Sequence, residues 1–270
     1  MKTPTCLFVP IIVLATTASA RQPRQTPHPG EPTDLRMRGQ YDQAIAAYDA
    51  LLETHPSDME ATCGLATCYL ETGRYAGALA ILQKAEPHAQ AEDTPPNERR
   101  MWHRAMAITY NVVGHYAEAI AHAKSALTID EGDLAARYLL GQLYEQTGRR
   151  DEAIDIYKRF DTNVLGQLPD DAADLTATAG GYLRYSVLTR HPNLVDRTVF
   201  TLRELYQRAY ERVDRTYWPA RLAAADLLRG KFRNDEAAKD YQAALRINDN
   251  LAGAHVGLGW IALDGWQFER

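Results

Sequence analysis

Residues 106–126, MAITYNVVGHYAEAIAHAKSA, are followed 34 positions later by residues 140–160, LGQLYEQTGRRDEAIDIYKRF, in the same register. Each stretch carries a glycine, Gly114 or Gly148, five residues before an alanine, Ala119 or Ala153. A 34-residue period with small residues at fixed offsets is typical of stacked helical hairpins, which bury a core only by packing on their neighbours. The sequence therefore predicts a scaffold built from repeated hairpins.

The same unit recurs along most of the chain. Earlier copies place Gly39 before Ala44 and Gly73 before Ala78, and a later copy places Lys231-Phe232 before Ala237. Successive glycines are 34, 41 and 34 residues apart, and the longer step contains Pro95-Pro96, which indicates a longer loop between two repeats. We expect the glycines to end the first helix of each hairpin in a left-handed backbone conformation.

The order of residue types within the unit resembles the tetratricopeptide repeat. An apolar residue, a small residue and an aromatic residue precede Gly-x-Tyr and a spaced pair of alanines, as in Met106, Ala107, Tyr110, Gly114 and Tyr116. The resemblance implies an all-α, right-handed superhelical solenoid of antiparallel helix hairpins. Small residues such as Ala107 and Gly141 should face Ala119 and Ala153, so that the two helices of a hairpin approach closely.

The chain divides into five predicted parts. Residues 1–20 combine Lys2, an apolar run and Ala18-Ser19-Ala20, which is the pattern of a cleaved signal peptide rather than of a membrane span. The proline-rich residues 21–32 are a predicted flexible linker. The remaining parts are a repeat array over 33–167, a divergent helical hairpin over 168–217, and a further repeat plus a half repeat over 218–270. We therefore expect an exported protein, periplasmic or extracellular after cleavage.

Charge and cysteine content exclude several classes of function. The formal net charge is −5 and both signs are interspersed, which argues against a nucleic-acid partner. Cys63 and Cys68 lie five residues apart on one predicted helix, too far apart for a disulfide, and no histidine or further cysteine completes a zinc site beside them. We expect both thiols to be free packing residues.

No motif for catalysis or for cofactor binding is present. The chain contains no HExxH, GxxxxGK[ST] or GxSxG string, and Gly257-Leu258-Gly259 falls inside a predicted helix rather than after a strand. His115, Glu118 and His122 share one side of a predicted helix, but three ligands on one helix are too collinear for a closed metal site. Asp170-Asp171 and Asp235-Glu236 precede predicted helices and are interpreted as helix starts. We expect no catalytic residue, no metal and no cofactor.

Recognition of a partner then remains as the function. In tetratricopeptide repeats the first helix of each hairpin lines the concave surface, and a groove of mixed polar and aromatic groups suits an extended peptide or a helix. The candidate groove positions here are Arg104, Asn111, Tyr138, Gln142 and Glu145, with Glu60, Thr67, Glu71, Ile108 and Val112 at further matching positions. Only Arg104 and Asn111 resemble a clamp for acidic carboxyl-terminal peptides, so that ligand class is not predicted.

Three hypotheses follow from the sequence. The preferred one is an exported, non-catalytic scaffold that binds a protein or peptide through its concave face. The alternative is the amino-terminal regulatory or substrate-binding region of an exported zinc metallopeptidase, because the stretch from Gly181-Tyr182-Leu183-Arg184 to Tyr217-Trp218-Pro219-Ala220 is similar to the front of such proteins. The third is a structural array that self-associates through its apolar carboxyl-terminal half repeat.

Overall fold

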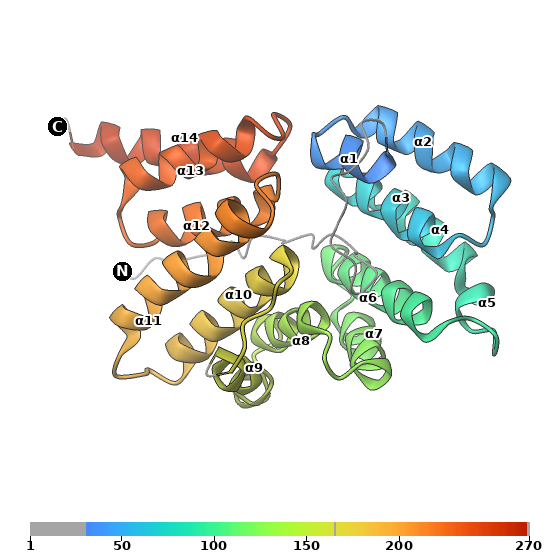
Figure 1. Ribbon diagram of the computed structural model, residues 1–270, viewed down its shortest axis with the longest axis horizontal. Coiled ribbons are helices and arrows are strands. Elements are labelled where there is room, and N and C mark those ends of the chain that lie inside the picture. Colours follow the sequence, from blue (N-terminus) through green and yellow to red (C-terminus); the bar gives the residue numbers. More distant parts are fainter. Residues whose placement is uncertain (1–30, 165, 269–270) are drawn as a thin grey trace.

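The computed structural model describes residues 31–164 and 166–268, and every regular element in this part of the chain is a helix (Figure 1). The helices pair in chain order into antiparallel hairpins. The pairs are α1 (Pro32–Met37) with α2 (Tyr41–Thr54), α3 (Met59–Glu71) with α4 (Tyr75–Lys84), α6 (Pro96–Val112) with α7 (Tyr116–Ile129), α8 (Leu134–Gln146) with α9 (Arg150–Val164), α10 (Ala172–Leu188) with α11 (Leu194–Phe200), and α12 (Trp218–Arg229) with α13 (Asn234–Leu245). The short α5 (Glu86–Ala89) follows α4, and α14 (Ala252–Phe268) is the last helix. The predicted all-α solenoid is confirmed.

Local sequence explains where the helices begin and end. Asp58, Asp133 and Asp171 are N-caps whose carboxylates accept hydrogen bonds from backbone N–H groups in the first turns of α3, α8 and α10. At the far end of the first helix of four hairpins, Gly39, Gly73, Gly114 and Gly148 have φ between 73° and 82°. The left-handed conformation predicted for Gly114 and Gly148 is confirmed.

Close packing between neighbouring helices depends on small residues opposite aromatic rings. The nearest side-chain atoms to Gly141 belong to the ring of Tyr157 in α9, and those nearest to Gly257 belong to Tyr241 in α13. Ala107, Ala119 and Ala153 are fully buried. One apolar core runs from α3 to α14, and a second, smaller cluster lies between α2 and α3. Each hairpin is thereby stabilised mainly by its neighbours.

The hairpin within residues 168–217 differs from the others in its second helix. After α11 the chain continues as π-helical turns over Thr201–Tyr206 and Arg208–Val213, so that one rod runs from Leu194 to Val213. This rod packs against α10, which is itself one of the longest helices. The 34-residue repeat pattern is lost in the same stretch of sequence that forms these π-helical turns.

The solenoid curves until its two ends meet. In Figure 1 the hairpins surround a central space, with the loop after α1 opposite the loop after α13. The two loops are joined by hydrogen bonds from Asn248 to Tyr41, 3.0 Å, and from Asn250 to the backbone oxygen of Gly39, also 3.0 Å. The array is therefore a ring closed by contacts between residues more than 200 positions apart.

The predicted signal peptide and nearly all of the predicted linker lie outside the described residues, as does Cys6. Within the described part, none of the helices has both the length and the apolar character needed to cross a bilayer. Cys63 and Cys68 are unpaired and buried, as predicted, and burial raises the pKa of each thiol to about 12. Neither thiol is ionised near neutral pH.

Candidate functional site

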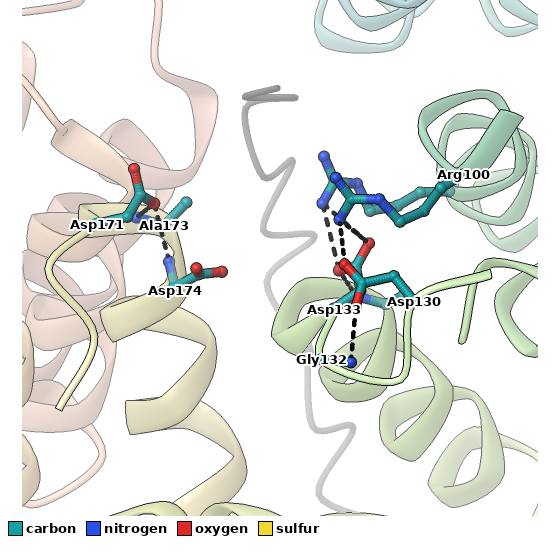
Figure 2. A network of polar contacts seen from close by, with 9 residues as sticks. Arg100, Asp130, Gly132, Asp133, Asp171, Ala173 and Asp174 are labelled. Atoms are coloured by element: carbon teal, nitrogen blue, oxygen red, sulfur yellow. Dashed lines mark hydrogen bonds and ion pairs between the residues drawn. The ribbon is translucent and has the colours of Figure 1, made fainter. Parts of the chain in front are cut away.

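The inner face of the ring carries a charged cluster at the contact between α6 and α8. The Arg100 guanidinium lies 3.0 Å from the Asp133 carboxylate and 3.3 Å from that of Asp130, and Arg104 lies 3.3 Å from Asp133 (Figure 2). Asp133 is nearly inaccessible, yet its Oδ1 also accepts the N-terminal N–H of Ala136 in α8. Because a buried carboxylate is stable only when it is fully paired, the two arginines hold the start of α8 against α6.

Two further carboxylates lie on the opposite side of the central space. Figure 2 shows both at the start of α10, where the Asp174 carboxylate points toward the side of the ring that carries Arg100 and Asp133 and the Asp171 carboxylate lies over the first turn of its own helix. Asp171 accepts hydrogen bonds from the backbone N–H groups of Ala173, 2.8 Å, and Asp174, 3.2 Å. Burial, together with the neighbouring charges of Asp171 and Asp133, raises the pKa of Asp174 to about 6.

Within residues 31–164 and 166–268, Asp174 differs from Asp133 in having no cationic partner in contact. Among the described residues, no group donates a hydrogen bond to its carboxylate, and Arg100 and Arg104 lower its pKa only as more distant charges. A half-buried carboxylate with a raised pKa gains stability when a positive group reaches it. The α10 side of the ring can therefore accept a cationic or hydrogen-bond-donating group.

A second polar group links α8, α9 and α10. The Glu145 carboxylate accepts a hydrogen bond from the hydroxyl of Tyr157, 2.9 Å, and one from Nε of Arg184, 2.9 Å, while the Arg184 Nη2 group also pairs with it. Tyr138 lies beside this group with 7% of its surface exposed, and its ring is the nearest neighbour of Gly180 in α10. Burial raises the pKa of Tyr138 to about 12, so the phenol stays neutral.

The five predicted groove residues therefore fall into two kinds. Arg104, Tyr138 and Glu145 are held by intramolecular partners, because Arg104 pairs with Asp133, Tyr138 packs on α10 and Glu145 pairs with Arg184. Asn111 and Gln142 are half-buried on α6 and α8, and the Gln142 side chain is hydrogen-bonded to Tyr138. Whether any of the five contacts a partner stays a prediction.

Sequence reasoning missed Arg100, Asp133, Asp174 and Arg184. Arg100 lies one helical turn before Arg104 on α6, so the pair could have been found as two arginines on one helix face. In the sequence, Asp133 and Asp174 show only that a helix begins nearby. Asp58 and Asp171 show the same, so the sequence does not distinguish Asp133 and Asp174 from ordinary helix starts. Their importance depends on α6, α8 and α10 meeting around the central space.

The structure separates the three residues that the sequence placed together as candidate metal ligands. His115 lies 3.7 Å from Glu118, and both side chains are exposed. His122 instead turns toward α6, where its Nδ1 lies 3.0 Å from Nδ1 of His103 and its ring packs edge-on against Trp102. Burial, followed by the neighbouring His122, lowers the pKa of His103 to about 4. The described residues contain no group of three or more His, Cys, Asp or Glu side chains arranged to hold a metal ion.

Large apolar side chains are exposed at two places in the last repeats. Val256, Trp260 and Leu263 of α14 are 57%, 50% and 52% exposed and follow one another by four and three residues. Phe232, in the turn between α12 and α13, is 88% exposed. The α14 residues form one continuous stripe, whereas Phe232 is isolated.

Comparison with protein-family models agrees with the repeat pattern. Family models described as tetratricopeptide repeat match residues 33–94 and residues 113–161. No curated protein matches the chain. Among solved structures, MamA is 18% identical and matches over 80% of this chain and 92% of its own, with a TM-score of 0.39. A tetratricopeptide repeat protein from Parabacteroides merdae is 17% identical over 88% of this chain and 85% of its own, with a TM-score of 0.46.

YrrB, described as a tetratricopeptide repeat protein with an unusual peptide-binding site, is 16% identical over 78% of this chain and 96% of its own, with a TM-score of 0.40. The first family-model match covers α1 to α5 and the second covers α7, α8 and most of α9, where the glycine and alanine pattern is regular. Residues 33–94 and 113–161 of this all-helical solenoid are therefore tetratricopeptide repeats.

Proposed function

We propose that this protein is an exported, non-catalytic scaffold that holds a protein or peptide partner against the inner face of its ring. The observation that carries the proposal is Asp174, whose carboxylate faces the side of the ring that carries Arg100 and Asp133 across the central space (Figure 2). Mixed charges and amide side chains on a concave surface suit a polypeptide, whose backbone and side chains offer donors and acceptors.

The geometry also favours one partner chemistry over another. Arg100 and Arg104 are already neutralised by Asp130 and Asp133, whereas Asp174 has no cationic partner in contact within the described part of the chain. A segment that brings a lysine, an arginine or a free amino group to Asp174 would therefore be preferred over an acidic segment. Asn111 and Gln142 would hydrogen-bond its backbone.

Export of the protein rests on the sequence of its first twenty residues alone. Lys2, the apolar run and Ala18-Ser19-Ala20 support cleavage before Arg21. Amino-terminal sequencing of the protein recovered from its native host tests this directly. A chain that still begins at Met1, or that remains in the cytoplasm, contradicts export.

Binding at the inner face is tested with a displayed library of random peptides selected on the purified protein. Selected peptides are titrated against the wild type, against Asn111→Ala/Gln142→Ala and against Asp174→Asn. The matched control is Asp155→Asn/Lys158→Ala, which changes two exposed residues of α9. We expect basic peptides, a weaker affinity in both inner-face variants and no change in the control. Equal affinities in all four proteins contradict the proposal.

Self-association through α14 is a second proposal, supported by the stripe of Val256, Trp260 and Leu263. Spacing by four and three residues places these side chains on one helix face, as in the seam between paired helices. Light scattering over increasing protein concentration should show dimers in the wild type and monomers in Trp260→Glu. Substitution of the exposed Phe232 by serine is the matched control. A wild type that remains monomeric at the highest concentration contradicts self-association.

A further inference from the structure

The junction that closes the ring is built from two loops and very few residues. Asn248 is fully buried, donates a hydrogen bond from Nδ2 to the Tyr41 hydroxyl, and accepts one at Oδ1 from the backbone N–H of Asn250, 3.0 Å. Asn250 in turn donates to the backbone oxygen of Gly39. Among the residues that the structure describes, these two asparagines therefore carry the hydrogen bonds between the first and last repeats.

Gly39 is required for this fit. Its φ of 74° is left-handed, and a Cβ atom added there would overlap Oδ1 of Asn248. The glycines at the same place in other hairpins, Gly73, Gly114 and Gly148, have no other atom within 4 Å of such a Cβ. At Gly39 the absence of a side chain therefore serves the junction as well as the turn.

The junction differs in kind from the contacts between successive repeats. Neighbouring hairpins bury aromatic rings against helices, as Tyr241 does against Gly257. Among the described helices, α1 and α2 make no extensive packing against α13 or α14. Instead, the loop between α1 and α2 and the loop between α13 and α14 border a polar pocket of about 470 Å³. Residues 38–43, 245–247, 249 and 250 line that pocket, including Arg38 and Arg246 from opposite sides.

We propose that Asn248 and Asn250 form a latch, and that the solenoid opens and closes at this junction while its other interfaces stay packed. A hydrogen bond between neutral groups contributes little net free energy because water replaces it when it breaks. Two such bonds hold a joint that lacks the apolar burial of the other interfaces. Opening there converts the closed ring into an open solenoid and widens access to the inner face.

Distance measurement between spin labels on the two sides of the junction tests the latch. Labels are attached at Gln43→Cys in α2 and Gln242→Cys in α13, both exposed positions, with Cys6 replaced by serine in every sample. The buried Cys63 and Cys68 have strongly raised pKa values and should not compete for the label. We expect one short, narrow distance distribution in the wild-type junction.

Removal of the latch should then populate longer distances. In Asn248→Ala/Asn250→Ala the open fraction should rise by about 10- to 100-fold, the factor expected for two lost hydrogen bonds. The matched control, Asn97→Ala/Asn193→Ala, changes two exposed asparagines away from the junction and should keep the wild-type distribution. A broad distribution in the wild type, or an unchanged one in Asn248→Ala/Asn250→Ala, overturns the proposal.

A reversible lock separates opening from misfolding. A Cβ at Gly39 would lie 3.5 Å from Cβ of Asn250, within the range of a disulfide, so the variant Gly39→Cys/Asn248→Ala/Asn250→Cys can be compared with itself in two redox states. X-ray scattering should give a larger radius of gyration for the reduced protein, and the wild-type value after oxidation. Identical radii in the two states, or failure of the disulfide to form, overturn the proposal.

Discussion

Replacement of Phe232 by glycine should stabilise this protein, although it removes a large aromatic side chain. Phe232 occupies the turn position that Gly39, Gly73, Gly114 and Gly148 occupy in the other hairpins, five residues before the buried alanine of the second helix. Its φ is 58°, in the left-handed region. The turn is hydrogen-bonded like the glycine turns, with the next residue, Arg233, donating to the Leu228 oxygen at 3.0 Å.

The magnitude follows from the balance of two backbone effects. A residue with a Cβ in the left-handed conformation costs about 1–2 kcal/mol. Glycine loses more conformational entropy on folding than other residues, which removes about 0.5–1 kcal/mol of that gain. The ring itself contributes little burial, because 88% of its surface is exposed. The expected net gain in the free energy of unfolding is about 0.5–1 kcal/mol.

Urea unfolding followed by circular dichroism measures this difference, and the melting temperature should rise by roughly 1–4 °C for a chain of this size. Phe232→Ala is the first control, because it removes the ring and keeps the strained backbone, so its stability should stay near that of the wild type. Gly73→Ala is the second control. It imposes the same strain where no other atom lies within 4 Å, and after the smaller entropy loss of alanine it should cost about 0.5–1 kcal/mol.

The reasoning is refuted if Phe232→Gly is less stable than the wild type, or if Phe232→Ala gains as much as Phe232→Gly. The first result would mean that the phenyl ring is packed in solution. The second would mean that the effect comes from the ring rather than from the backbone.

Three further predictions concern packing, a buried ion pair and pH. Gly141→Ala places a methyl group in the volume of the Tyr157 ring and should lower the free energy of unfolding by about 1–3 kcal/mol. The control Gly259→Ala, in an uncrowded stretch of α14, should raise it by about 0.5–1 kcal/mol. Equal unfolding midpoints in the two variants would contradict the packing of Gly141 against Tyr157. Arg36→Met leaves the buried Glu71 carboxylate, 2.8 Å away in the wild type, without its partner and should lower the free energy of unfolding by about 3–5 kcal/mol. The double variant Arg36→Met/Glu71→Leu should restore much of this stability. If Arg36→Met is as stable as the wild type, the ion pair does not stabilise the fold. The pKa of His103 is about 4 in the folded protein and 6.5 ordinarily, so the folded state binds fewer protons between these values and loses stability as the pH falls through them. Unfolding curves measured from pH 7 to pH 4 should therefore show a smaller loss of stability in His103→Gln than in the wild type. Asp174, whose raised pKa has the opposite effect, is present in both proteins. An identical pH dependence in the two proteins would show that His103 does not carry the effect.

The local pattern of the sequence was sufficient to predict the hairpins and much of their detail. The spacing of Gly114 and Gly148 predicted left-handed turns, and Asp171 was interpreted correctly as a helix start. Cys63 and Cys68 were correctly predicted to be unbridged. Each of these features depends on residues close together in the chain, where helix geometry fixes which side chains can meet.

The candidate site was predicted less completely than the fold. Repeat register placed Arg104 and Tyr138 on the first helices, but it could not show that Asp133 and α10 bury them. His122 was grouped with His115 by its spacing along α7, whereas in the structure it pairs with His103 of α6. A residue's position in a repeat specifies the helix face it occupies, and the partner across that face depends on a neighbouring element of different sequence.

The sequence by itself determined a tetratricopeptide-like array, its turns and its unpaired thiols, because these follow from periodicity within one or two hairpins. Only the tertiary structure decided that Asn248 and Asn250 reach Gly39 and Tyr41, and that Asp174 faces the arginines of α6 across the ring. The small rotation between each hairpin and the next accumulates over the whole array. Whether the two ends meet therefore depends on the sum of all the interfaces, which no single stretch of sequence encodes.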